Sequence, residues 1–535
     1  METVAARTNR LAYDNCFSGD PGRIDADFER HQAVTPEQLI AVAEGYLLEK
    51  PYVALSCVPL SKTELAACGR SSDQERAEVE LDRSQIPTPK PKRLFQAPTI
   101  WRSDVDQGPR IVGTPFTKLP LTRLSVSLPA GRLLESQDKL GLSSLTAEMM
   151  EEGTQRLRST ELQDELDGLG AEFYVIPEDD GCRLELAVLN QHFETAVDLL
   201  GEVLREPRLD EEDFQRLKRQ RLVDIQSRRD RVGEVASEAF AALVHGRENI
   251  KGSPHLGTPE SVDSMTLEDV RSFWRDNYRL ADGTLCMVGE RSAEDSRLLF
   301  AERLQGLAPA QGDEIAGHTA PVLGPEAISL YVVNKPGAAQ SELRIGHKGV
   351  ARTDPDFFGL HVLNYILGGS FTSRLNLNLR EDKGYTYGVN SGFSGGRTPG
   401  SFVVRCAVET AVTGPALKEV LSELQRIHTG VEEHEVDLCR RAISQAMARS
   451  LESARARLSM LESITRYGLP DDYIAKRMQW LERASAKQLD DLAARYLEKD
   501  RLICLVAGDL EKIRGPLEEL GIGAVQEMAL ELEPV

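Results

Sequence analysis

The sequence predicts an α+β protein with two consecutive homologous domains, each an antiparallel-rich sheet with packed helices. One pattern, an amphipathic helix that ends in Tyr and precedes a short apolar strand, occurs three times, at Tyr46, Tyr278 and Tyr496. The spacings of 232 and 218 residues indicate repeated domains, because solenoid units are only about 20–50 residues long. Strands are expected in hairpins and helices in pairs, which is typical of α+β rather than of alternating βαβ units.

Other segments share this period. Residues 202–220 and 419–441 each predict a helix, a turn and the start of a second, long helix. Residues 170–188 and 385–408 each contain two alternating or apolar runs around a turn with Gly, which predicts a hairpin. The repeat is therefore a complete domain and not a local motif.

The repeats define the expected boundaries. We expect the C-terminal remnant of a preceding domain, a linker, a complete domain, a connector and a second complete domain, at residues 1–62, 63–100, 101–310, 311–325 and 326–535. The linker is polar, charged and contains Pro. A remnant without its own sheet cannot bury its apolar face, so we expect the C-terminal part of a longer protein. The alternative is that residues 1–60 are a small helical extension.

Composition excludes several classes of function. The net charge of −21 and the pI near 5.1 repel phosphate backbones and anionic membranes, and attract cationic peptides. The N-terminal residues have no apolar core of a signal peptide, and no run of about 18 apolar residues predicts a membrane span. The eight cysteines include no C-x-x-C, so neither a zinc knuckle nor a disulfide framework is indicated.

Three segments resemble a known family. Residues 341–393 (SELRIGHKGVARTDPDFFGL and onward), 257–290 and 147–175 are similar to pitrilysin/insulinase-type zinc peptidases, which carry an inverted H-x-x-E-H motif. The resemblance covers nearly the whole chain. The resemblance implies that this chain is one half of a clamshell. In this family two homologous halves, on one chain or on two, close around a chamber. One half carries zinc, and the other helps to hold the peptide.

The zinc motif itself is degenerate. Residues four apart share a helix face, so two imidazoles of H-x-x-E-H converge on one ion and the Glu takes a proton from zinc-bound water. We expect the helix at residues 141–154, anchored on Gly153 and Thr154. The two His positions then fall on Ser144 and Glu148, the Glu on Ala147, and the distant third ligand on Asp224. Both imidazoles and the general base are absent, so this chain alone is predicted to be inactive.

No other metal site compensates for this loss. Glu148 and Asp224 would suit a hard cation, but two carboxylates are too few for a tight site. The nearest histidine pair, His428 and His434, is six residues apart, which is not a same-face helical spacing. An independent metal enzyme built on Glu148 and Asp224 is therefore the least favoured hypothesis, and no cofactor is expected in this chain. Zinc is expected in the catalytic half.

The substrate-holding motif is retained. Arg380 and Tyr387 match the Arg/Tyr pair that, in the family, reaches from the half without zinc toward the bound peptide. An Arg fork and a Tyr hydroxyl can hold a peptide carbonyl and stabilise its oxyanion. Alternatively, Arg380 pairs with Glu381 and Tyr387 packs in a strand. Gly368 and Gly369 would permit close approach of a peptide backbone, or they end a helix.

Two functions follow from these residues. The first is the substrate-holding, non-catalytic half of a zinc endopeptidase that acts on unfolded peptides, with an H-x-x-E-H half upstream or on a partner subunit. The second is a catalytically silent structural or assembly subunit of the same fold. The expected partners are the catalytic half and a peptide, not nucleic acid. The resemblance to bacterial envelope proteins favours the periplasm or cell envelope over the cytoplasm.

Overall fold

The computed structural model describes residues 3–48, 97–106, 108–304 and 325–529, and divides into two compact units, 1–95 and 96–535. The described part of the first unit is three helices, α1 (Val4–Ser18), α2 (Ile24–Gln32) and α3 (Pro36–Tyr46). α3 is the first copy of the helix that ends in Tyr. The strand expected after it, most of the predicted linker 63–100 and almost all of the predicted connector 311–325 lie outside the described residues.

The second unit begins with a six-stranded sheet. Its strands are β1 (Trp101–Asp104), β2 (Arg110–Pro115), β3 (Leu121–Leu128), β4 (Glu172–Pro177), β5 (Cys182–Leu189) and β6 (Thr284–Gly289), in the order β1-β2-β6-β3-β5-β4. Only β2 and β6 pair in parallel. The helices of this domain are α4 (Leu142–Met150), α5 (Ser159–Gly168), α6 (Phe193–Arg205), α7 (Glu211–Asp230), α8 (Val232–His245), α9 (Pro259–Ser264), α10 (Leu267–Asn277) and α11 (Ala293–Arg303).

The second domain repeats this plan. Its strands are β7 (Ser329–Asn334), β8 (Gln340–Lys348), β9 (Val389–Gly395), β10 (Pro399–Glu409), β11 (Ile503–Gly508) and β12 (Val525–Glu527), in the order β12-β7-β11-β8-β10-β9. Its helices are α12 (Phe357–Leu367), α13 (Arg374–Asn376), α14 (Thr413–Arg426), α15 (Glu433–Ser450), α16 (Ala454–Arg466), α17 (Tyr473–Arg483), α18 (Ala486–Tyr496) and α19 (Leu510–Glu518). A π-helical turn, Leu377–Asp382, follows α13.

The two sheets confirm the predicted fold class. Five strands recur in the same spatial order, because β2-β6-β3-β5-β4 corresponds to β7-β11-β8-β10-β9. The two predicted hairpins are β4–β5 and β9–β10, and the two predicted helix pairs are α6–α7 and α14–α15. Among the described helices, none is long and apolar enough to cross a membrane.

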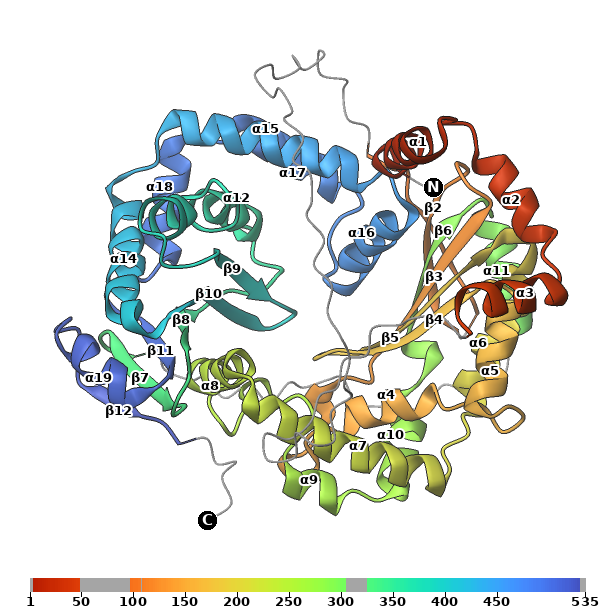
Figure 1. Ribbon diagram of the computed structural model, residues 1–535, viewed down its shortest axis with the longest axis horizontal. Coiled ribbons are helices and arrows are strands. Elements are labelled where there is room, and N and C mark those ends of the chain that lie inside the picture. Colours follow the sequence, from red (N-terminus) through yellow and green to blue (C-terminus); the bar gives the residue numbers. More distant parts are fainter. Residues whose placement is uncertain (1–2, 49–96, 107, 305–324, 530–535) are drawn as a thin grey trace. The chain divides into compact units, whose positions relative to one another are not determined.

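Each domain lends one helix to the other domain's sheet. α8 packs on β7, β8 and β11 of the second sheet, whereas α16 packs on β2, β3 and β6 of the first (Figure 1). The α8 contact is a core cluster in which Phe240 and Ala236 meet Val403 and Leu505. The α16 contact includes a hydrogen bond from Arg457 Nη1 to Pro115 O at 2.8 Å. This exchange covers a face of each sheet with a helix from the other domain.

Candidate functional site

The helix that corresponds to the zinc motif is α4. It begins after Gly141, where φ is +91° and an added Cβ would lie 2.4 Å from the Leu256 carbonyl oxygen, so only glycine fits. Glu135 caps its first turn by accepting hydrogen bonds from the backbone N–H groups of Gly141 at 3.1 Å and Ser143 at 2.8 Å. Burial raises the pKa of Glu135 to about 6, although these two donors act in the opposite direction.

A guanidinium group from α7 meets the face of α4 that would bind zinc. Arg221 Nη1 donates to Ser144 Oγ at 2.7 Å and to Gly141 O at 3.3 Å, and Nη2 lies 2.7 Å from Glu148 Oε1. The Arg221 side chain is only 2% exposed. One buried positive charge therefore lies between the two positions at which the family motif places histidines.

Sequence reasoning did not single out Arg221. The signal that could have found it is helical spacing, because Arg221 lies seven residues after Phe214 and four before Ile225. All three are buried, and they are the residues of α7 that are buried. A charged residue at a core position of a helix requires a partner, and here the partners are Ser144 and Glu148.

Asp224 lies apart from this cluster. It is exposed, and its carboxylate accepts a hydrogen bond from Gln220 Nε2 at 3.1 Å. Asp224 lies three residues after Arg221, yet its side chain is exposed, whereas those of Arg221 and Ile225 are buried. Ala147, at the position of the general base, is fully buried. The structure thus brings Ser144 and Glu148 together around Arg221, and does not bring Asp224 to them.

These residues do not fit zinc. A hydroxyl, a methyl and one carboxylate replace the donor set of two imidazoles and a base, and the Arg221 cation already occupies the space between them. No group of three His, Cys, Asp or Glu that could hold a metal ion occurs in the part of the chain that the structure describes. No hydrolytic step through a metal can be derived for α4.

The Arg/Tyr segment lies in the second domain and is largely solvent-facing. Arg380, on the π-helical turn, stacks on Phe371, with Cζ 3.8 Å from the ring centroid, and its Nη1 lies 3.0 Å from Glu381 Oε1. Tyr387 is 96% exposed and precedes β9, so it does not pack in a strand. Phe371 is also exposed, at 66%. Sequence reasoning missed Phe371, although an aromatic residue in a Gly/Ser-rich loop is a signal for recognition.

Gly368 and Gly369 end α12. The backbone N–H groups of both glycines donate to Asn364 O, at 2.9 and 2.8 Å. A Cβ on Gly368 would lie 2.3 Å from Ser391 Oγ, and Ser391 N donates to Gly368 O at 3.1 Å, so this glycine lets the helix end pack against β9. The helix-stop interpretation accounts for Gly368. Gly369 is exposed.

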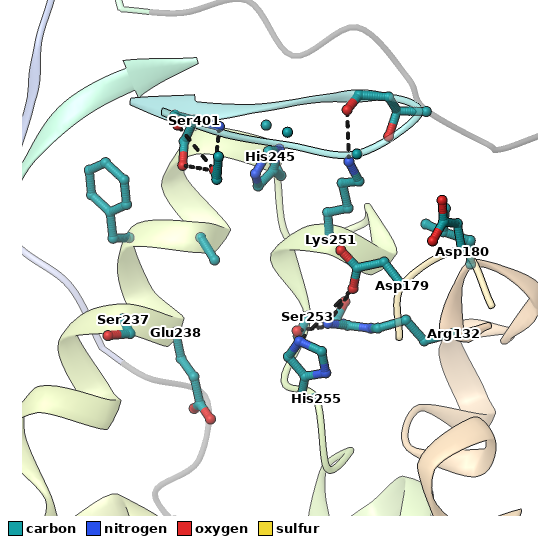
Figure 2. Close-up of a pocket in the computed structure, with 18 of the residues that line it drawn as sticks. Arg132, Asp179, Asp180, Ser237, Glu238, His245, Lys251, Ser253, His255 and Ser401 are labelled. Carbon is teal, nitrogen blue, oxygen red and sulfur yellow. Dashed lines mark hydrogen bonds and ion pairs between the residues drawn. The ribbon is translucent and has the colours of Figure 1, made fainter. Parts of the chain in front are cut away.

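A pocket of about 440 Å³ lies where the two domains meet. Figure 2 shows His245, at the end of α8, and Lys251, in the loop after it, reaching toward the β9–β10 hairpin. Lys251 Nζ donates to Pro399 O at 3.1 Å. Burial, followed by the charges of Lys251 and Lys348, lowers the pKa of His245 to about 4. Burial also lowers the pKa of Lys251 and raises that of Glu238.

The charges of this pocket join the two domains to each other. Arg466 of α16 forms ion pairs with Glu178 and Asp180 of the β4–β5 turn. Arg397 of the β9–β10 hairpin lies 3.6 Å from the same Asp180 carboxylate. Arg132 donates to Ser253 O at 2.7 Å, which fixes the loop seen in Figure 2. The predicted site residues are not among those that line this pocket.

Two family models match the chain. Residues 118–248 match insulinase (peptidase family M16), and residues 264–443 match the peptidase M16 inactive domain. Together these segments make up more than half of the chain.

The named relatives include proteins described as proteases and one described as a non-peptidase. An uncharacterized zinc protease, YmxG of Bacillus subtilis, is 24% identical over 363 residues, 67% of this chain and 86% of that protein. A non-peptidase homolog, YmxG of Helicobacter pylori, is 21% identical over 401 residues, 74% of this chain and 90% of that protein. The names differ on catalysis, but the alignments with both span most of each chain.

Solved structures show the same fold. A peptidase M16 inactive domain from Pseudomonas fluorescens has a TM-score of 0.70 at 23% identity, over 77% of this chain and 98% of that one. A protease from Helicobacter pylori has a TM-score of 0.71 at 16% identity, over 77% and 99%. The chain belongs to peptidase family M16, and it has the fold of that family's inactive domain.

Proposed function

We propose that this chain is the non-catalytic, substrate-holding half of an M16 zinc endopeptidase that acts on unfolded peptides. Zinc and the general base come from a second, H-x-x-E-H-bearing half, on the same chain or on a partner subunit. The two halves close as a clamshell around the peptide. The name non-peptidase homolog of the Helicobacter pylori relative supports the absence of catalysis, as does the Arg221 cation on α4.

The observation that carries the holding role is the contact of the exposed Phe371 ring with the partly buried Arg380, together with the exposed Tyr387 seven residues after Arg380. The Arg380 guanidinium is positioned by the Phe371 ring, and Tyr387 is almost fully exposed with its hydroxyl free to donate. Exposed aromatic residues beside an Arg are typical of recognition surfaces. Arg380 and Tyr387 would donate hydrogen bonds to a peptide carbonyl, and these bonds would strengthen as that oxygen gains negative charge.

A second function is supported by the Arg221 cluster. An ion pair and hydrogen bonds that tie α4 to α7 are suited to a purely structural domain. On this hypothesis the chain is a silent assembly subunit, and the Phe371–Arg380 group contacts a fixed protein partner. The two functions differ in what substitutions at Arg380 and Tyr387 would do to peptide turnover.

The test is peptidase activity on an unstructured peptide, with this chain alone and with the catalytic half added. We expect turnover only in the mixture, with loss on chelation. Arg380→Ala with Tyr387→Phe should reduce turnover about 100- to 1,000-fold, the range for loss of an oxyanion donor. Arg483→Ala with Tyr174→Phe is the matched control, because both residues are exposed elsewhere. An unchanged rate in the first variant would favour the structural function.

A further inference from the structure

A second pocket, of about 690 Å³, lies within the second domain between α12, α15, α16 and α17. These helices are labelled in Figure 1. Its volume is within the range of about 300–1,000 Å³ that is typical of ligand sites. Gly369 contributes to its wall. The pocket is separate from the inter-domain pocket of Figure 2 and from the Arg221 cluster.

Two arginines of this pocket stack on aromatic rings, and neither forms an ion pair with a carboxylate of the described residues. Arg477 Cζ lies 4.3 Å from the Phe358 ring centroid, and Arg352 Cζ lies 4.5 Å from that of Phe357. The adjacent Phe357 and Phe358, at the start of α12, thus each take one guanidinium face. Stacking occupies the flat face of a guanidinium group, so the N–H donors at its edge do not take part in the contact.

One donor of each guanidinium group, the Nε N–H, lacks an acceptor. The Nε atoms of Arg352 and Arg477 are buried, and neither has a hydrogen-bond partner among the described residues. Burial of such donors without an acceptor is unfavourable. A ligand that brings an acceptor into the pocket would recover this free energy.

The electrostatics of the pocket contrast with those of the whole chain. Arg352, Arg455 and Arg477 line it, and no Asp or Glu occurs among the described lining residues, although the chain carries a net charge of −21. Desolvation, followed by the charges of Arg477 and Arg352, lowers the pKa of His361. Concentrated, uncompensated positive charge of this kind selects an anion.

The other residues that line the pocket indicate which kind of molecule carries the anionic group. The floor is apolar and buried, with Ile443, Met447 and Met460. Along the rim lie the hydroxyls of Ser459 and Ser463. Ser463 Oγ already donates to Ser459 O at 2.9 Å, so the exposed Ser459 hydroxyl is the one that can donate to a ligand. A peptide backbone offers this hydroxyl both a donor and an acceptor, and a polymethylene chain offers neither.

We propose that this pocket binds the C-terminal carboxylate of an apolar peptide. Arg352 and Arg477 hold the carboxylate through their N–H edges, and the floor receives apolar side chains. The terminal carboxylate is the acidic group that every unmodified peptide carries. Because this protein has a large negative net charge, it repels a peptide with one carboxylate less than a peptide with several. The inference deepens the proposed peptide-holding role and rests on it for the class of ligand.

The test is direct binding to the full chain without a catalytic half. The probes are a rhodamine-labelled apolar hexapeptide with a free C-terminus, its C-terminal amide, and the amide with an internal Glu. We expect the acid to bind about 10- to 100-fold more tightly than either amide, the fold-change of a charge-assisted hydrogen bond. Arg477→Gln or Arg352→Gln should abolish this preference. Arg483→Gln, an exposed change on the same helix α17, should retain it.

Three outcomes would overturn the proposal. They are equal binding of acid and amide, binding of the Glu-containing amide as tight as that of the acid, and binding of laurate without any peptide binding, which would assign the pocket to a fatty acid. The acid–amide comparison uses the unmodified protein, so it stands even if a variant fails to fold. It needs no turnover, so an inactive mixture in the peptidase assay would reject the half-enzyme function without affecting this result.

Discussion

Arg221 shows how a single residue can take over the place of a metal ion. A zinc ion would join α4 to α7 through ligands on both helices, and the guanidinium joins the same helices through Ser144 and Glu148. A fork of fixed donors suits this position, because it reaches a hydroxyl and a carboxylate at once. The cation also repels any second positive charge at short range.

Restoring the zinc motif alone should therefore fail. Ser144→His, Ala147→Glu and Glu148→His together rebuild H-x-x-E-H, but Arg221 keeps its charge between the new imidazoles. We expect stoichiometric zinc, measured by metal analysis after dialysis, only when Arg221→Glu is added. The quadruple variant should bind zinc at least about tenfold more tightly, since removing the cation gains more than about 1.4 kcal/mol. Circular dichroism on all variants controls for folding, and tight zinc binding with Arg221 in place would contradict the prediction.

His245 gives the inter-domain pocket a dependence on pH. Its pKa is lowered to about 4 in the folded protein from an ordinary 6.5, so between these values the unfolded chain binds more protons. Stability must then fall as pH drops from about 6.5 toward 4, by at most about 1.4 kcal/mol per pH unit. In urea titrations at pH 7 and pH 5, His245→Gln should lose less stability than the parent. His434→Gln, at an exposed position, should behave as the parent does, and identical losses in all three would refute this assignment.

At the residue scale, sequence reasoning located the degenerate positions and the exposed Tyr387 but not their partners. Ser144 and Glu148 follow from the motif's spacing on a helix. Arg221 does not, because the identity of the facing residue depends on how α7 packs against α4. In the same way, Phe371 contacts Arg380 only through the fold of the loop between α12 and the π-helical turn.

At the scale of elements, the hairpins and helix pairs were predictable because their patterns are local. The end of α12 was not settled, since a Gly-Gly pair is compatible both with a helix stop and with ligand approach. Packing decides between them, because Ser391 of β9 fills the space beside Gly368. The exchange of α8 and α16 was also beyond a sequence pattern, because an amphipathic helix does not specify which sheet it covers.

Gly368 should accordingly be intolerant of substitution. Gly368→Ala brings Cβ to within 2.3 Å of Ser391 Oγ, and we expect a loss of about 1–3 kcal/mol in the free energy of unfolding, as for overpacking. Gly388→Ala, in the same segment, is the matched control, because its Cβ would meet nothing within 4 Å. Urea unfolding of both variants measures the difference. Equal stability would mean that the end of α12 can shift away from β9 without a penalty.

At the scale of the whole molecule, the exchanged helices should make the two homologous domains unfold together. α8 leaves the first domain to complete the core against β7, β8 and β11, and α16 does the reverse. Neither sheet keeps its cover if the other domain unfolds, so one cooperative transition is expected for residues 96–535. Phe240, 5% exposed in the α8 cluster, reports on this coupling.

The three tryptophans allow each domain to be followed separately. Trp101 and Trp274 lie in the first domain and Trp480 in the second. One variant keeps only the tryptophans of the first domain, and another keeps only Trp480. The urea midpoints of the two variants, measured by fluorescence, should coincide. Phe240→Ala should lower both midpoints together, with a loss of about 3–5 kcal/mol in the free energy of unfolding, whereas Leu298→Ala, an exposed position on α11, should move neither. Separate midpoints, or a shift confined to one tryptophan set, would mean that each sheet is stable without the helix supplied by the other domain.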